Sequence, residues 1–309
     1  MVIAIAGMGP VGRTIVDTLL ETPEYQKQVA VLTRKKEASS LPDQVEQIEV
    51  DYNDVSSLAA SLEKHNIDTV ICTIGMVTPE AGQSQVNLIQ AAEKSSVTKR
   101  FIPSEYSFVQ SEEILHITPG VQLYIDAINA LKETKLKYTR ILPGYFMDYW
   151  GMPNTRTHLK PLAYGVDIPS GRALIPGDGN NVITLTHSYD MAKFIVKLLG
   201  AEEWPELAYM GGDDLTFNEL LSLAEEIRGT KFEVSYDSLE KVKKNESTPL
   251  PQSDKVVYPP EIISWIVSYM SQVVVIDGFS LPKENRVNNM FPDVKPVAMR
   301  EFLAKAWKA

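Results

Sequence analysis

The chain has 309 residues, a length that suits one large or two modest domains. With 44% hydrophobic and 23% charged residues it reads as a globular protein, and no apolar run reaches the length of a membrane span. The net charge of −10 argues against a nucleic-acid-binding body, which needs a basic face, but leaves room for one small anionic ligand.

Cysteine and histidine usage narrows the class of protein further. Cys72 is the only cysteine, which excludes a disulfide framework and favours a reducing, cytoplasmic location. The four histidines show no ligand spacing, so we expect no metal site. The start, MVIAIAGMGP, lacks a basic leader, and we therefore expect no signal peptide.

Short apolar runs alternate with helical patterns in the first half of the chain. Alternating strands and helices are typical of a parallel, doubly wound sheet, and fully apolar strands such as VIAIA suit a sheet covered on both faces. We therefore predict an α/β fold with a Rossmann-type domain over residues 1–152. The predicted strands are 2–6, 29–33, 47–50, 68–74, 100–103 and 138–142, and the predicted helices are 10–20, 55–64, 83–94 and 120–134.

After Pro143 the pattern changes to shorter and less regular elements. We predict a hairpin over 172–187 that turns at Asp178-Gly179, followed by a helix over 189–199. The polar stretch 245–254 is a loop. Residues 153–309 are thus expected to form a smaller, irregular α+β lobe that binds the substrate, with part of 184–200 packing back on the first domain. Further strands are expected at 207–210 and 231–236, and helices near 216–228, 260–272 and 297–307.

The strongest local signal is the glycine motif at the end of the first predicted strand. Gly7, Gly9 and Gly12 form GxGxxG, with Pro10 and Val11 opening the next helix. The first glycine permits a tight turn, the second lets a pyrophosphate approach the backbone, and the third permits close helix–strand packing. The motif predicts a dinucleotide site, the alternative being a glycine-rich turn in a nucleotide-free domain.

Basic residues follow the second predicted strand. An NAD-preferring domain places an acid there to hold the ribose 2′-hydroxyl, but this chain has Arg34 and Lys35, and its first acid is Glu37. A guanidinium matches the oxygens of a 2′-phosphate, so we predict NADP(H) as the cofactor. The alternative is a solvated basic loop.

Three further residues are candidates for cofactor contacts. Asp51 follows the third strand, where such residues often lie beside the adenine, whereas Asp54 is as well explained as a helix cap. Thr73 and Gly75 end the fourth strand and are expected to line the middle of the cofactor.

Segments spread over most of the chain resemble the NmrA-like and isoflavone-reductase-like family of atypical short-chain dehydrogenases. The most specific are KRFIPSEYSF (99–108) and FPDVKPVAMREFL (291–303), and YTRILPGYF (138–146) agrees with them. The resemblance implies an NADP(H)-binding domain with the nicotinamide near Pro103, Ser104, Glu105 and Tyr106. It also implies a C-terminal lobe that covers a hydrophobic substrate, often an aromatic plant or fungal metabolite.

The family resemblance also implies a lysine that this chain lacks. In reductases of the family this lysine holds the nicotinamide ribose and assists proton transfer, fifteen residues before the threonine of the YT pair. Counting back from Thr139 gives Tyr124, and no lysine lies between Arg100 and Lys132. Helical spacing places Tyr124 at the edge of an apolar stripe.

Three interpretations of Tyr124 stay open. It is a cleft-lining aromatic without a chemical role, or its phenol replaces the lysine as a proton donor. For a tyrosine proton donor, the usual activating lysine stands four residues after the tyrosine, but in this chain that residue is Ile128. In the third interpretation the protein has left hydride transfer for cyclisation or isomerisation, or binds NADP as a redox sensor, as NmrA-type regulators do.

Other polar and aromatic residues complete the candidate site. Glu105 is an acid or base if burial raises its pKa, or else a structural acceptor, and Tyr106 beside it is a further catalytic candidate. His187 is a candidate substrate contact or a structural histidine. An aromatic cluster beyond the sixth strand either stacks on a flat substrate or forms core, with Phe146 also a candidate cofactor contact. The cluster comprises Tyr145, Phe146, Tyr149 and Trp150.

These observations favour a cytoplasmic NADPH-dependent reductase of a small hydrophobic metabolite, which reduces a C=C, C=N or C=O bond in secondary metabolism. The proton would come from Tyr124, Glu105 or ordered water. The alternatives are a non-redox cyclase or isomerase and an NADP-binding regulator. We expect a monomer or homodimer with no nucleic-acid or membrane partner.

Overall fold

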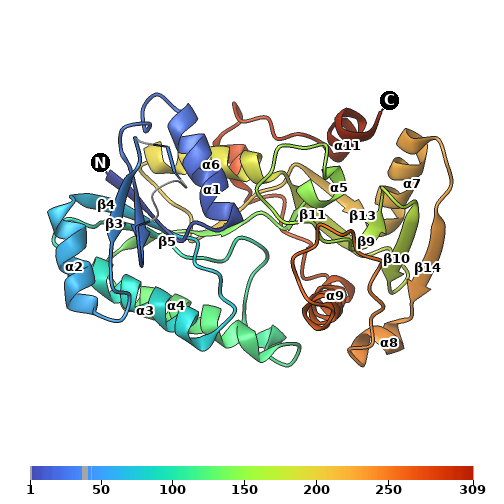
Figure 1. Ribbon diagram of the computed structural model, residues 1–309, viewed down its shortest axis with the longest axis horizontal. Coiled ribbons are helices and arrows are strands. Elements are labelled where there is room, and N and C mark those ends of the chain that lie inside the picture. Colours follow the sequence, from blue (N-terminus) through green and yellow to red (C-terminus); the bar gives the residue numbers. More distant parts are fainter. Residues whose placement is uncertain (1, 37–40, 43, 309) are drawn as a thin grey trace. The chain divides into compact units, whose positions relative to one another are not determined.

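The computed structural model describes residues 2–36, 41–42 and 44–308 and contains two compact units (Figure 1). The first unit runs to Leu142 and includes Ala192–Ala208, and the second comprises Pro143–Met191 and the chain from Tyr209 onward. These compact units divide after Leu142, whereas the boundary predicted from the sequence lies after residue 152. The reason is strand β8 (Tyr145–Phe146), which pairs with β11 (Val182–Thr186) of the second unit.

The first unit is built on a six-stranded sheet of strand order β3-β2-β1-β4-β5-β6, in which every pairing is parallel. This is the order of a Rossmann-type doubly wound sheet, so the predicted fold class is confirmed. The predicted strand 138–142 is split, because β7 (Arg140–Leu142) leaves this sheet and pairs with β12 (Leu207–Tyr209). The six strands are β1 (Val2–Ala6), β2 (Val29–Thr33), β3 (Glu46–Glu49), β4 (Ile67–Cys72), β5 (Arg100–Ile102) and β6 (Lys137–Tyr138).

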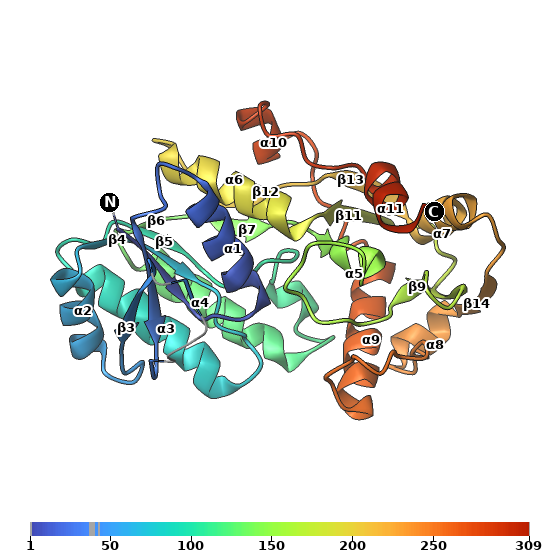
Figure 2. The same cartoon turned by 45° about the horizontal axis from the view of Figure 1, so that its top comes forward.

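Helices cover both faces of this sheet. Helices α2 (Val55–Lys64), α3 (Pro79–Lys94) and α4 (Gln122–Lys132) lie along one face, and α1 (Pro10–Glu21) lies on the other (Figures 1 and 2). Short 3-10 helices, η1 (Glu112–Ile114) and η2 (Pro119–Val121), precede α4. The apolar stripe predicted around Tyr124 is buried as expected, with Ile125, Ile128 and Leu131 among the buried hydrophobic residues.

The second unit holds two three-stranded sheets. One has the order β13-β11-β8 and the other β14-β10-β9, with β9 (Gly165–Asp167), β10 (Arg172–Pro176), β13 (Asp213–Thr216) and β14 (Glu233–Asp237). Helix α6 (Ser188–Gly200) passes from this unit into the first. The remaining helices are α5 (Asp148–Gly151), α7 (Phe217–Arg228), α8 (Leu239–Lys243), α9 (Pro260–Val275), α10 (Val287–Met290) and α11 (Met299–Trp307).

The predicted hairpin over 172–187 is wrong. Strands β10 and β11 form where strands were expected, but they belong to different sheets. Gly177 and Gly179, with φ of 66° and 76°, both adopt the left-handed conformation in the connection. These turns let β10 pair in parallel with β14 while β11 joins β13 and β8. In the described part of the chain, no helix is long and apolar enough to cross a membrane.

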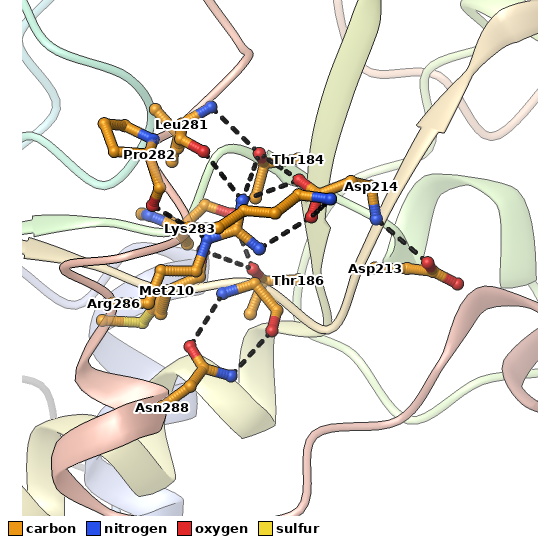
Figure 3. A network of polar contacts seen from close by, with 12 residues as sticks. Thr184, Thr186, Met210, Asp213, Asp214, Leu281, Pro282, Lys283, Arg286 and Asn288 are labelled. Atoms are coloured by element: carbon orange, nitrogen blue, oxygen red, sulfur yellow. Dashed lines mark hydrogen bonds and ion pairs between the residues drawn. The ribbon is translucent and has the colours of Figure 1, made fainter.

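A buried ion pair ties β11 and β13 to the segment before α10 (Figure 3). Arg286 donates hydrogen bonds to both carboxylate oxygens of Asp214, at 2.7 and 2.8 Å, and to Thr184 Oγ1 at 3.1 Å. Burial acts to raise the pKa of Asp214, but the hydrogen bonds from Arg286 and Thr184 outweigh it and hold that pKa below its usual value. The pair therefore contributes stability above the ordinary aspartate pKa, and that contribution is lost as the pH falls through the lowered pKa.

Removing one partner of this pair should be costly. Asp214→Ala leaves the Arg286 guanidinium buried without its counter-charge, so the free energy of unfolding should fall by about 3–5 kcal/mol in urea denaturation. Lys283→Ala is the matched control, because it removes an exposed ammonium 3.4 Å from the same carboxylate and should cost under about 1 kcal/mol. Equal losses in the two variants would contradict this assignment.

Candidate active site

The glycine motif forms the turn between β1 and α1. Gly7 has a φ of 99°, and a Cβ there would lie 2.8 Å from the Thr73 carbonyl carbon. A Cβ on Gly12 would lie 2.2 Å from the Gly7 carbonyl oxygen. The protein itself therefore needs glycine at both positions. A Cβ on Gly9 would meet no atom within 4 Å, so the chain's own packing leaves open space there, which suits a ligand that approaches the backbone.

The start of α1 is prepared for an anion. Pro10 occupies the first turn, no side chain caps the helix, and the first turn carries no acid. Free N–H groups and the positive end of the helix dipole therefore remain available for a phosphate. Pro10 and Val11 themselves lie in the helix, and Met8 is the neighbour that reaches the cavity wall.

A cavity of about 440 Å³ opens over this turn. Five of the predicted cofactor residues line it, namely Gly7, Gly9, Arg34, Thr73 and Gly75. Thr73 is fixed by its hydroxyl, which donates to the carbonyl oxygens of Ala6 and Gly7. The other wall residues are Met8, Leu32, Thr33, Tyr52, Ile74, Thr78, Glu80, Ala81 and Ser84.

Arg34 is exposed at the carboxyl end of β2 and is the basic residue on this wall. Lys35 does not line the cavity; its carbonyl oxygen accepts a hydrogen bond from the Thr33 hydroxyl at 2.7 Å. Glu37 lies outside the described residues. The site therefore fits an NADP(H) molecule: it has an open glycine turn and an uncapped helix start for the pyrophosphate, and a guanidinium for the 2′-phosphate.

The structure places Asp51 differently from the prediction and adds Tyr52. The Asp51 carboxylate accepts a hydrogen bond from Asn53 N at 2.9 Å, which closes a local turn, and Asp51 is not on the cavity wall. Asp54 caps α2 through Ser56 N and Ser57 N, as considered from the sequence. Tyr52 lines the cavity instead, with its hydroxyl donated to Leu32 O at 3.1 Å. A large aromatic residue next to Asp51, shortly after the third strand, was the available signal.

Hydrogen bonds hold the side chains of Glu105 and Tyr106, in the segment that follows β5. Glu105 accepts two hydrogen bonds from Arg140, at 2.7 and 2.6 Å, and one from Gln110 N at 2.9 Å. The Tyr106 hydroxyl donates to Cys72 O at 2.9 Å, and burial raises the pKa of this tyrosine well above its ordinary value. Both side chains therefore have structural partners, so we leave Glu105 and Tyr106 out of the proposed proton path.

Tyr124 is half-buried on α4, the helix that follows this segment. Burial, and then the negative charge of Glu105, raise the pKa of Tyr124 to about 12. The phenol is thus neutral near pH 7 and can donate a hydrogen bond, but it lacks the cationic neighbour that would make it a ready acid.

The aromatic cluster of the second unit divides into core and cavity residues. The ring of Tyr145 packs 5.1 Å from Trp150 and 5.7 Å from Phe279, between ring centroids. Tyr145, Phe146 and Trp150 are all buried, and none of them lines the glycine-loop cavity or the cavity of the second unit on whose wall Tyr149 lies. Phe146 lies on β8, where its backbone pairs with Thr186. Because none of the three residues lines either cavity, we keep none of them as a ligand contact.

Tyr149 does line a cavity, which has a volume of about 720 Å³ within the second unit. Burial raises the pKa of Tyr149 far above its ordinary value, which keeps the phenol neutral as a hydrogen-bond donor. Most of the wall is apolar or uncharged. The lining residues include Met152, Pro153, Thr155, Leu159, Pro161, Leu162, Ala163, Val166, Ile168, Pro251 and Val256, with Asp167, Asp254 and Lys255 as the charged members.

His187 lies behind this wall. Its Nε2 is 3.4 Å from the hydroxyl of Thr155, a wall residue, and 3.7 Å from Asp148 Oδ1. Its ring stacks on Tyr189, with 5.9 Å between centroids. A ligand in the cavity would therefore reach His187 through Thr155 rather than directly.

The buried tyrosines predict a loss of stability in alkali. Burial raises the pKa of Tyr52, Tyr106, Tyr124, Tyr149 and Tyr164, so the folded chain keeps protons that the unfolded chain releases near pH 10. Each should remove about 1.4 kcal/mol of stability per pH unit above that point. The urea midpoint should therefore stay nearly level up to about pH 9 and fall steeply between about pH 10 and about pH 11.5. A flat midpoint over this range would contradict these shifts.

Comparison with known proteins agrees with the fold and with a nicotinamide cofactor. Residues 7–201 match the model of a family described as NAD(P)H-binding. The oxidoreductase swnN of Metarhizium robertsii is 31% identical, over 99% of this chain and 97% of its own. The oxidoreductase BOA1 of Botryotinia fuckeliana is 33% identical, over 74% of this chain and 77% of its own.

Solved structures agree at the level of the fold. A structure described under pinoresinol-lariciresinol and phenylcoumaran benzylic ether reductases superposes with a TM-score of 0.75 at 20% identity, over 98% of each chain. Leucoanthocyanidin reductase from Vitis vinifera, solved with NADPH, also gives 0.75, at 18% identity over 99% of each chain. The chain belongs to the NmrA-like and isoflavone-reductase-like family of NAD(P)H-binding oxidoreductases.

Proposed function

We propose that this protein is an NADPH-dependent reductase of a small hydrophobic or aromatic metabolite. The observation that carries the proposal is the glycine-loop cavity, where open space at Gly9 and the uncapped start of α1 meet a guanidinium at Arg34. The named oxidoreductases among its relatives support the same reaction class. When bound in this cavity, the cofactor supplies a hydride.

The chain's own residues would bind and orient the two reactants. The N–H groups at the start of α1 hold the pyrophosphate, and Arg34 holds the 2′-phosphate. The apolar cavity around Leu162 and Val166 takes the flat body of the substrate, and the neutral phenol of Tyr149 offers it a hydrogen bond. Tyr124 serves as a hydrogen-bond donor, with ordered water as the final proton source.

The absence of the family lysine supports a non-redox function as the second candidate. The position of the family lysine is taken by Tyr124, whose raised pKa weakens it as an acid. A non-redox cyclase or isomerase on the same scaffold would not need that lysine, and neither would an NADP-binding regulator.

A panel of three aromatic electrophiles tests the proposal. Purified protein is mixed with NADPH and a chalcone, a cyclic aryl imine or an aryl ketone, which offer a C=C, a C=N and a C=O bond in a similar flat body. NADPH consumption matched by a product that has gained two hydrogen atoms supports the reductase. A product formed without NADPH loss supports the cyclase or isomerase, and tight cofactor binding with no turnover supports the regulator.

A further inference from the structure

Two loops at the carboxyl ends of β4 and β5 are fastened to one another. The first, Cys72–Met76, contributes Thr73, Ile74 and Gly75 to the wall of the glycine-loop cavity. The second is the segment 103–106. The Ser104 hydroxyl donates to Ile74 O at 2.8 Å, and the Tyr106 hydroxyl donates to Cys72 O at 2.9 Å.

Gln85 on α3 joins both loops through a single side chain. Its Oε1 accepts a hydrogen bond from Ser104 N at 2.7 Å, and its Nε2 donates to Met76 Sδ at 3.5 Å. The residue is 1% exposed. A buried amide with both ends bonded to two different loops fixes how far apart those loops lie, because neither group can turn to solvent instead.

The strand order predicts which half of the cofactor passes the two loops that Gln85 joins. A dinucleotide binds across a doubly wound sheet at the point where the strand order reverses, here between β1 and β4. Arg34 and Tyr52 lie on the β2 and β3 side of that point, which therefore receives the adenosine half. The other half must pass the loops after β4 and β5.

We infer that Gln85 is a positioning residue for the nicotinamide half of the cofactor, because it holds the two loops on which that half must rest. This inference rests on NADP(H) binding in the glycine-loop cavity, and not on which substrate is reduced or whether any is.

Two ligands separate this role from a general structural one. NADPH has both halves of the cofactor, whereas adenosine 2′,5′-bisphosphate has only the half that meets Arg34. Gln85→Leu removes the acceptor of Ser104 N, so NADPH binding should weaken about tenfold or more. Binding of the bisphosphate should stay within about twofold of the wild type, since its contacts lie on the β2 and β3 side of the point where the strand order reverses.

Thr98→Val is the matched control. The Thr98 hydroxyl is also buried and donates to Ile67 O at 2.8 Å, but it lies at the amino ends of β4 and β5. This variant should lower the thermal midpoint and leave both dissociation constants unchanged. Gln85→Glu, which keeps an acceptor for Ser104 N, should retain more NADPH affinity than Gln85→Leu.

Ser104→Ala provides a milder variant should Gln85→Leu fail to fold, because it removes only the hydroxyl bonded to Ile74 O. It should also weaken NADPH more than the bisphosphate. Equal weakening of both ligands, no weakening of either, or a wild-type protein that does not bind NADPH would overturn the inference. Wild-type protein that binds NADPH without ever oxidising it would refute the proposed reductase and leave the role of Gln85 intact.

Discussion

Gly9→Ala should weaken NADPH binding about a hundredfold while leaving the thermal midpoint close to that of the wild type. The added methyl group meets no protein atom, but it occupies the space through which a pyrophosphate must reach the N–H groups of α1. Losing two charge-assisted hydrogen bonds accounts for an effect of this size. Isothermal titration with NADPH measures it.

Gly12→Ala is the informative companion of this variant. Its methyl group would lie 2.2 Å from the Gly7 carbonyl oxygen and 2.6 Å from Thr73 Oγ1, so the turn itself must shift. This variant should lower the thermal midpoint as well as the affinity. If Gly9→Ala bound NADPH as tightly as the wild type, the cofactor would not lie against this turn.

Arg34→Ala should separate the two nicotinamide cofactors. Its guanidinium can contact a 2′-phosphate, which NADH lacks, so NADPH binding should weaken about 10- to 100-fold while NADH binding hardly changes. Lys35→Ala is the control, because Lys35 is a neighbouring cation that does not line the cavity. Separate titrations of the two cofactors give both constants.

Two outcomes would remove Arg34 from the site. One is an equal loss of affinity for both cofactors, which would indicate a general disturbance of the loop. The other is a wild-type protein that binds NADH more tightly than NADPH.

The sheet and its glycine turn were predictable because their signals are local. Apolar strands alternate with helical patterns, and Gly7 and Gly9 stand between β1 and α1 with Gly12 inside the helix, so spacing alone places the motif. The hairpin over 172–187 failed because strand pairing depends on partners distant in sequence. Leu174 of β10 pairs with Ser235 of β14, and no local sequence pattern predicts that pairing.

The candidate site was predictable mainly for residues whose position follows from the end of a strand. Gly7, Gly9 and Thr73 are placed by strand ends, whereas Gln85 acts through a hydrogen bond to Ser104, on another element. The partner of Glu105 is likewise distant, since Arg140 follows it by 35 residues. Such pairings arise from packing, and one sequence does not display them.

Tyr124 illustrates a limit of a different kind. Its place on the apolar edge of α4 follows from helical spacing, but its chemistry depends on burial and on the nearby charge of Glu105. Those two influences raise its pKa, whereas a lysine four residues on would have lowered it. The sequence therefore identified the residue, and the structure indicates that its phenol stays protonated.

The most direct test of hydride transfer uses NADPH deuterated at its transferable hydrogen, together with a small-molecule extract of the organism that encodes the protein. We expect a metabolite that gains one deuterium while an equal amount of NADP⁺ forms, with both signals reduced in Arg34→Ala. A metabolite converted without deuterium and without NADPH loss would contradict hydride transfer.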